Sequence, residues 1–332
     1  MKTAVVILNW NTEGFLRDFL PGLLQSVRNV EGAEVIVADN ASSDGSMTVM
    51  KEMFPQVRTI AFDKNYGFTG GYNRAFEQID SEYFVLINSD IEVPQDWLGP
   101  LVDWMDTHPE CGACAPKLHS WQEREKFEYA GAAGGYIDLF GYPFCRGRVL
   151  KRLETDMGQY DTPADVFWAT GACLMVRSSL YRRLGGLDER FFAHMEEIDL
   201  CWRMQLEGFK VTVVPESVVY HLGGGTLPAS SPFKLFLMKI FIFCQHFSEK
   251  LPLFHFAFFL VQDQIYPVIQ FFDSKPGTAQ YSNTDNNRQS YPHKFTHFQI
   301  SCGKRRCLVS VIGFKFNIVG GLRNRLRSCQ LR

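Results

Sequence analysis

The sequence lacks several features that would place it in a special class of protein. It contains no run of about 20 apolar residues, the length that a membrane-spanning helix needs, so we expect no simple transmembrane helix. Its nine cysteines stand at irregular spacings, which argues against a disulfide framework and favours reduced thiols in the cytoplasm. A strand-like run begins at Thr3, where a signal peptide would carry a longer apolar segment, so we expect no secretory leader.

Acidic residues are missing from the C-terminal part of the chain. None follows Asp285, whereas ten lysines and arginines do, although the net charge of all 332 residues is only -2. We expect a globular domain over residues 1–227, which ends beyond a glycine run at 223–225, and a C-terminal extension over 228–332. The extension is aromatic at first, then polar and partly disordered over 273–293, and basic at its end.

The motifs of several common binding classes are also absent. The glycine-containing stretch 65–73 has the spacing of neither a Walker A loop nor GxGxxG, and there is no nucleophile elbow. No nucleic-acid motif accompanies the basic tail, so we expect no nucleic-acid partner. Basic residues interleaved with aromatic ones instead suit the surface of an anionic membrane.

Short apolar runs alternate with amphipathic stretches in the first part of the chain. The runs cover 5–8, 35–38, 57–61 and 83–87, and stretches with helical spacing follow them. This alternation predicts an α/β fold whose mostly parallel sheet is flanked by helices. Residues 126–165 are rich in glycine and aromatics, and we expect hairpins or mobile loops there. Ligands of such sheets bind beyond the carboxyl ends of the strands.

Polar side chains follow three of these runs, and we expect them to meet on one rim of the sheet. Asn9 and Asn11 follow the first run, Asp39 follows the second, and Asn88 and Asp90 follow the fourth. At a strand end, Asp90 is placed to bind a hard cation such as Mg²⁺ or Mn²⁺, or else to cap a turn or helix. Asp39 is placed to accept hydrogen bonds from a ribose or base, or simply holds its turn.

A glycine-rich stretch precedes a helix that we expect from about residue 72. Asn65 and Gly67 belong to this stretch, and its glycines allow a ligand to approach the backbone closely. Tight packing of the helix would explain Gly70 and Gly71 equally well.

Three carboxylates cluster at the start of another predicted helix. Asp199 and Arg203 are four residues apart and can pair on one helix face, which leaves Glu196 and Glu197 for chemistry. The alternative is that all three only complement the helix N-terminus. His221 follows another strand-like run and is either a metal ligand or a structural histidine.

In this order and spacing, the motifs resemble those of the family 2 glycosyltransferases with the GT-A fold, in particular their rhamnosyltransferase-like branch. The resemblance spans about residues 3–227. It rests on VVILNWN at 5–11, VADNASSDGS at 37–46, NYGF at 65–68, LINSD at 86–90 and EEIDLCWR at 196–203.

The resemblance implies a site for a nucleoside-diphosphate sugar. Asp39 would contact the nucleoside, and Asp90 would hold the divalent metal as the second member of an Asp-x-Asp motif in which Asn88 replaces the first Asp. His221 matches a histidine that completes the metal site. The donor motifs also include Asn9, Asn11, Asn65 and Gly67.

The resemblance further implies the chemistry. Glu197 matches the general base, which is usually an aspartate in the family, and Glu196 or Asp199 are the alternatives. The activity would be inverting transfer of a sugar, such as rhamnose, to a lipid-linked or polysaccharide acceptor. This would serve cell-surface glycan synthesis in the cytoplasm, at the inner face of the membrane.

Two other functions stay open. A catalytically impaired sugar-nucleotide-binding subunit would account for Glu197 in place of Asp and for a C-terminal region unlike that of the family. A sugar nucleotidyltransferase would share the nucleotide-binding sheet. It would normally carry a basic glycine-rich loop near the N-terminus, and residues 9–14 contain no Lys or Arg.

Overall fold

The computed structural model describes residues 1–129, 131–138, 143–149, 152–191 and 195–223, and the backbone of 296–302, 305–312 and 315–319. The chain forms two compact units, Met1–Ile265 and Tyr266–Arg332. The domain boundary that we predict at 227 and the polar stretch 273–293 both lie outside the described residues. The boundary therefore stays a prediction.

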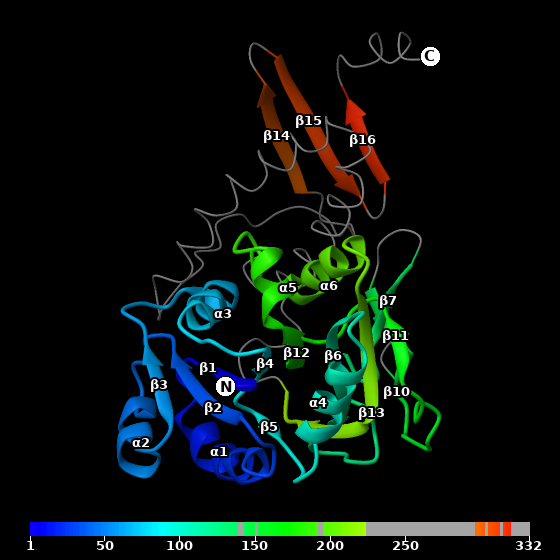
Figure 1. The fold of residues 1–332 in the computed structure, drawn as a ribbon. Helices are drawn as coiled ribbons and strands as arrows, with labels where there is room; N and C mark the ends of the chain where they lie inside the picture. The colour runs from blue at the N-terminus through cyan, green and yellow to red at the C-terminus, as the bar shows by residue number, and fades with distance from the viewer. Residues whose placement is uncertain are drawn as a thin grey trace. The chain divides into compact units, whose positions relative to one another are not determined.

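The first unit is built on a nine-stranded mixed sheet, shown in Figure 1. Its strand order is β11-β13-β6-β12-β4-β1-β2-β3, and β5 pairs with β13. Strands β1 to β4, β6 and β13 run in one direction, whereas β11 and β12 run against them. The predicted α/β fold with a mostly parallel sheet is confirmed. The strands are β1 (Thr3–Asn9), β2 (Ala33–Asp39), β3 (Arg58–Ala61), β4 (Tyr83–Ile87), β5 (Ile91–Glu92), β6 (Cys111–Ser120), β11 (Ala164–Val166), β12 (Cys173–Arg177) and β13 (Lys210–His221).

Helices cover both faces of this sheet (Figure 1). On one face lie α1 (Glu13–Val27), α2 (Ser46–Met53) and α4 (Leu98–Thr107), and on the other lie α3 (Gly67–Glu77), α5 (Ser178–Arg183) and α6 (Glu196–Leu206). Side chains alternate between the two cores along each strand, so Val5 packs with the α1 side and Val6 with the α3 side. Burial of both faces explains why the strands are continuous apolar runs.

Helix α3 begins at Gly67, five residues before the start that we predict from the sequence. Its glycines lie inside the helix because it packs closely on β1. A Cβ atom on Gly71 would lie 2.6 Å from Leu8 Cδ1. Helix packing, the alternative that we give for these glycines, is therefore the structural reason for Gly71.

The expected hairpins are present within residues 126–165. They pair β7 (Gly135–Ile137) with β8 (Pro143–Cys145), and β9 (Arg148–Val149) with β10 (Arg152–Leu153). A buried ion pair fastens this segment to the sheet, because Lys117 Nζ of β6 lies 2.7 Å from Asp156 Oδ2. His119 Nε2 lies 2.9 Å from the same oxygen.

Replacing Asp156 by asparagine should destabilise the fold by about 2–3 kcal/mol, because it weakens charge-assisted hydrogen bonds to a buried lysine. Burial alone would raise the pKa of Asp156, but the hydrogen bond from Lys117 and others lower it. The stabilisation is therefore present above the usual aspartate pKa and is lost as the pH falls through the lowered value. Urea unfolding at two pH values measures both effects.

Asp161→Asn is the matched control for this variant. Asp161 also contacts Lys117 Nζ, at 2.6 Å, but its side chain is 62% exposed. The control should cost less than about 1 kcal/mol. Equal losses of unfolding free energy in the two variants would contradict the role assigned to burial.

The second unit contains a three-stranded antiparallel sheet that the sequence does not lead us to expect. It consists of β14 (Thr296–Cys302), β15 (Arg305–Ile312) and β16 (Lys315–Val319), in that order. The C-terminal extension thus has regular structure within the basic tail.

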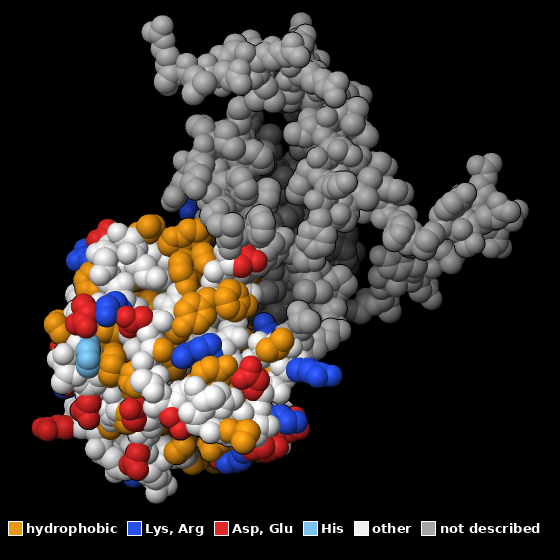
Figure 2. Space-filling model, turned by 90° about the vertical axis from the view of Figure 1, so that its right-hand side faces the viewer, with side chains coloured by type: hydrophobic (Ala, Val, Ile, Leu, Met, Phe, Trp, Pro, Cys, Tyr) orange, Lys and Arg blue, Asp and Glu red, His pale blue; other side chains and the backbone are white. Residues whose placement is uncertain are grey.

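Two observations bear on the predicted membrane contact. None of the helices in the described part of the chain is both long enough and apolar enough to cross a bilayer. On the face of the first unit that Figure 2 shows, basic and acidic side chains are interspersed, not gathered by sign. The hypothesis of an anionic membrane surface therefore depends on the basic tail, whose side chains lie outside the described residues.

Candidate functional site

The carboxyl ends of β1, β2, β4 and β13 open on one rim of the sheet, as their shared direction requires. Asn9 and Asp39 end neighbouring strands and are paired in register. On the other side of β4, His221 ends β13 and pairs with Ile91, the residue after Asp90. The predicted site residues therefore fall into groups along this rim.

Asp39 is held in a fixed orientation at the first group. Its Oδ1 accepts a hydrogen bond from Asn9 Nδ2 at 2.7 Å, and its Oδ2 accepts one from the backbone N–H of Ser42 at 3.0 Å. Asp39 is only 2% exposed, and Asn9 is fully buried. Asn9 thus positions Asp39, and a ligand would meet the remaining lone pairs of the Asp39 carboxylate.

Asn11 joins the loops that follow β1 and β2. Its Oδ1 accepts hydrogen bonds from the backbone N–H groups of Ser43, at 2.7 Å, and Asp44, at 3.3 Å. Its own backbone N–H donates to Ser42 Oγ at 3.0 Å. Asn11 has a positive φ of 56°, which asparagine tolerates better than most residues. Its side chain is thus engaged in shaping the rim.

Asn40, which follows Asp39 at the end of β2, organises the loop that contains Asn65 and Gly67. Its Nδ2 donates to Asn65 Oδ1 and to the Gly67 carbonyl, both at 2.9 Å. Its Oδ1 accepts the backbone N–H of Tyr66 at 2.8 Å. The structure therefore brings 65–67 against the end of β2, beside Asp39.

The second group consists of Asn88, Asp90, His221 and Glu128. His221 Nε2 lies 3.2 Å from Asp90 Oδ1, and its Nδ1 lies 3.5 Å from Glu128 Oε1. Asn88 Nδ2 lies 3.4 Å from His221 Nε2. The predicted pair of Asp90 and His221 is thus in direct contact. Glu128 was missed because it lies in the irregular segment after β6, where no strand pattern indicates a site residue.

His221 lies between these two carboxylates, which favour its protonated form. Burial by itself would lower its pKa, but the hydrogen bonds and charges of Asp90 and Glu128 raise the pKa to about 10. A metal ion bound to the imidazole would displace this proton.

The donor set fits a divalent ion only in part. A carboxylate and an imidazole suit Mn²⁺, and a carboxylate suits Mg²⁺. Within the described ranges, however, no three His, Cys, Asp or Glu side chains are grouped to hold a metal by themselves. An ion held by Asp90 and His221 would need further ligands, which substrate phosphates commonly supply.

Glu196 and Glu197 begin α6 on the opposite face of the sheet from α1. Glu197 lies near the rim, because a Cβ atom on Gly171, just before β12, would lie 3.5 Å from Glu197 Cβ and 3.6 Å from Phe68 Cζ. Glu196 is 6% exposed, and its Oε2 has no hydrogen-bond partner among the residues described. Burial, followed by the charge of Glu197, raises the pKa of Glu196 well above its usual range.

Asp199, the third carboxylate of this cluster, has a structural partner. Its Oδ2 lies 2.6 Å from an Arg203 guanidinium nitrogen, as the spacing of four residues predicts. Arg203 also donates to the carbonyls of Leu184 and Gly186, each at 2.9 Å. Arg203, oriented by Asp199, therefore anchors α6 to the loop after α5.

These features define an α/β protein with a nucleotide-binding type of rim, and comparison with known proteins shows its family. The sequence profile described as Glycosyl transferase family 2 matches residues 4–185, more than half of the chain. The chain belongs to this glycosyltransferase family, and the family predicted from the motifs is confirmed.

Two relatives are similar over most of their own length. One is N-acetylglucosaminyl-diphospho-decaprenol L-rhamnosyltransferase of Mycobacterium tuberculosis, 26% identical over 240 residues, which cover 65% of this chain and 75% of the relative. The other is rhamnosyltransferase WbbL of Escherichia coli, 25% identical over 221 residues, covering 61% and 78%.

A solved structure shares the fold. The crystal structure of GalNAc-T7 with UDP, GalNAc and Mn²⁺ superposes with a TM-score of 0.56 at 17% identity. The match covers 70% of this chain but only 46% of that chain. It supports the GT-A fold that the motifs predict.

Proposed function

We propose that this enzyme transfers a sugar, with inversion, from a nucleoside-diphosphate donor to a lipid-linked or polysaccharide acceptor. The observation that carries the proposal is the joint placement of Asp90 with His221 and of Glu197 on the rim that also carries Asp39. Such a rim offers a nucleoside contact, a diphosphate site and a base, which are the parts that this transfer requires.

The donor would lie along the rim. Asp39, fixed by Asn9, would accept hydrogen bonds from the nucleoside, with the Asn65–Gly67 loop beside it. Asp90 and His221 would hold a divalent ion at the diphosphate, as the Mn²⁺ in the GalNAc-T7 structure suggests. When bound, this ion offsets the charge that develops on the departing nucleoside diphosphate.

Glu197 is the general base in this proposal. It would accept the proton of the acceptor hydroxyl as that oxygen attacks the anomeric carbon from the side opposite the leaving group. Burial and the charge of Glu197 raise the pKa of Glu196, which disfavours the ionised form that would accept this proton. Asp199 is engaged in an ion pair with Arg203, so it is not the base in this proposal.

The names of the relatives suggest the substrates. Both are rhamnosyltransferases, and the mycobacterial one is named for a lipid diphosphate that carries N-acetylglucosamine. We infer a similar acceptor for this enzyme and a deoxysugar such as rhamnose as the transferred group. Attachment to an anionic membrane surface by the basic tail would bring the enzyme to such a lipid.

The experiment is an assay of nucleoside diphosphate release from a panel of nucleotide sugars. It is run with Mn²⁺ or Mg²⁺, with EDTA, and with or without an N-acetylglucosaminyl-diphospho-lipid acceptor. We expect acceptor-stimulated, metal-dependent release and a product of inverted anomeric configuration by NMR. In a parallel reaction with a nucleoside triphosphate and a sugar 1-phosphate, release of pyrophosphate would indicate a nucleotidyltransferase. Donor binding by calorimetry without turnover on any acceptor would indicate an impaired binding subunit.

A further inference from the structure

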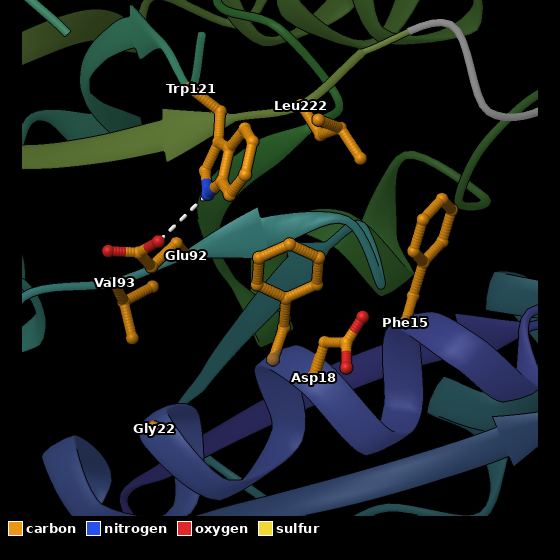
Figure 3. Close-up of a pocket in the computed structure, with 8 residues that line it drawn as sticks. Phe15, Asp18, Gly22, Glu92, Val93, Trp121 and Leu222 are labelled. Carbon is orange, nitrogen blue, oxygen red and sulfur yellow. Dashed lines mark hydrogen bonds between the residues drawn. The ribbon is translucent and has the colours of Figure 1, made fainter.

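A pocket of about 390 Å³ opens between α1 on one side and Glu92, Trp121 and Leu222 on the other (Figure 3). Three aromatic rings and two aliphatic side chains form most of its lining, and two carboxylates accompany them. The lining includes Phe15, Asp18 and Phe19 from α1, and Glu92, Trp121 and Leu222 from the opposite wall. None of these residues has a part in the donor site described above.

The far wall of the pocket is directly connected to the proposed diphosphate site. The backbone N–H of Leu222 donates to the Asp90 carbonyl at 3.1 Å, and that of Trp121 donates to the His221 carbonyl at 3.0 Å. Glu92, at the end of β5, follows Asp90 by two residues in the chain. A molecule in the pocket would therefore lie close to the bound donor.

Trp121 is exposed but held in place. Its Nε1 donates to Glu92 Oε2 at 2.8 Å, and its ring meets Phe19 edge to face, with centroids 6.4 Å apart. Arg124 holds Glu92 from another side, at 2.7 Å. The Trp121 side chain is 37% exposed, so a fixed aromatic surface is available to a ligand at little cost in conformational entropy.

Gly22 leaves room on the α1 side of the pocket. It lies in the interior of α1, where glycine is unfavourable relative to alanine. A Cβ atom added there would meet no other atom within 4 Å, so internal packing does not require glycine at this position. Because Gly22 lines the pocket, close approach of a ligand to the helix backbone would account for it.

We propose that this pocket binds a saccharide unit of the acceptor glycan, remote from the hydroxyl that reacts. The C–H face of a sugar ring packs on aromatic rings such as Trp121, and its hydroxyls donate hydrogen bonds to carboxylates such as Asp18. A hydrocarbon chain would match the rings but would remove water from the Asp18 carboxylate without replacing its hydrogen bonds. The inference rests on the proposed transferase function.

The first test measures acceptor kinetics of Gly22→Ala, with Gly99→Ala in α4 as the matched control. Gly99 also lies in a helix with open space around it, but it does not line the pocket. Gly22→Ala should raise the melting temperature by about 2 °C. It should also raise the KM for an acceptor of two or more sugars about tenfold, a change of 1.4 kcal/mol. The control should leave KM unchanged.

Donor turnover distinguishes a failure of the pocket proposal from a failure of the proposed transferase function. If neither variant nor wild type turns over any donor, with or without acceptor, the transferase function itself fails. If donor turnover is normal and Gly22→Ala leaves the KM for long acceptors unchanged, the pocket proposal alone is overturned. A rise in the KM for the donor instead of the acceptor would also overturn it.

The second test detects binding directly. The six tryptophans are labelled with 5-fluorotryptophan, and Trp121→Phe identifies the ¹⁹F resonance of Trp121. Titration with di-N-acetylchitobiose should shift this resonance in the wild type. In Asp18→Asn, the dissociation constant obtained from the titration should be at least about fivefold higher. A response to decyl phosphate but not to the saccharide would overturn the saccharide assignment.

Discussion

Asp90→Asn should release nucleoside diphosphate about 10²–10³-fold more slowly than the wild type, the usual cost of losing one electrostatic contact to a developing charge. Asparagine keeps the size of the side chain but removes the charge that would hold the divalent ion. The variant also takes one of two carboxylates from His221, which Glu128 still contacts at 3.5 Å. The measurement is the initial rate at saturating donor across a Mn²⁺ titration.

Asp103→Asn provides the control for Asp90→Asn, because it makes the same change on the exposed face of α4. It should leave the rate and its Mn²⁺ dependence unchanged. If Asp90→Asn turned over the donor as fast as Asp103→Asn, Asp90 would not be the residue that holds the metal.

Glu197→Gln should lower the rate of sugar transfer about 10²–10⁴-fold, the range expected for loss of a general base. Glutamine cannot accept the acceptor proton, but it preserves the side chain's size and the start of α6. Donor affinity should therefore stay within about twofold of the wild type. Calorimetry with the donor and a transfer assay at saturating acceptor measure the two properties separately.

Two glutamates on the same helix test the choice of Glu197. Glu196→Gln should slow transfer less than about tenfold, because burial raises the pKa of this carboxyl and disfavours the ionised form that a base requires. Glu207→Gln, at the exposed end of α6, should have no effect. A large loss for Glu196→Gln together with full activity of Glu197→Gln would assign the base to Glu196.

The central strands could be predicted because their signal is local. Strands buried on both faces are runs of Val, Ile and Leu, and β1, β2 and β4 appear as such runs. Polar residues directly after such runs then fall on one rim, and Asp39 and Asp90 could be predicted as site residues for this reason. The pairing of Asp199 with Arg203 follows equally from helix geometry.

Other site residues have no local signal. Glu128 reaches His221 because β6 and β13 are neighbours, and its own segment shows no periodic pattern. The hydrogen bonds of Asn40 to the loop at 65–67 have no local signal, because they form only when that loop folds against the end of β2. The pocket joins α1 to residues more than a hundred positions away.

Local sequence patterns were enough to predict the α/β class, the family and the rim on which Asp90 lies, because strand burial and strand direction follow from such patterns. Only the tertiary structure decided which atoms surround each side chain. It shows Asn9 buried beneath Asp39, His221 between two carboxylates, and Glu196 more deeply buried than Glu197. These properties depend on contacts between segments distant in the chain, and burial and charge at such contacts set the protonation and orientation of each group.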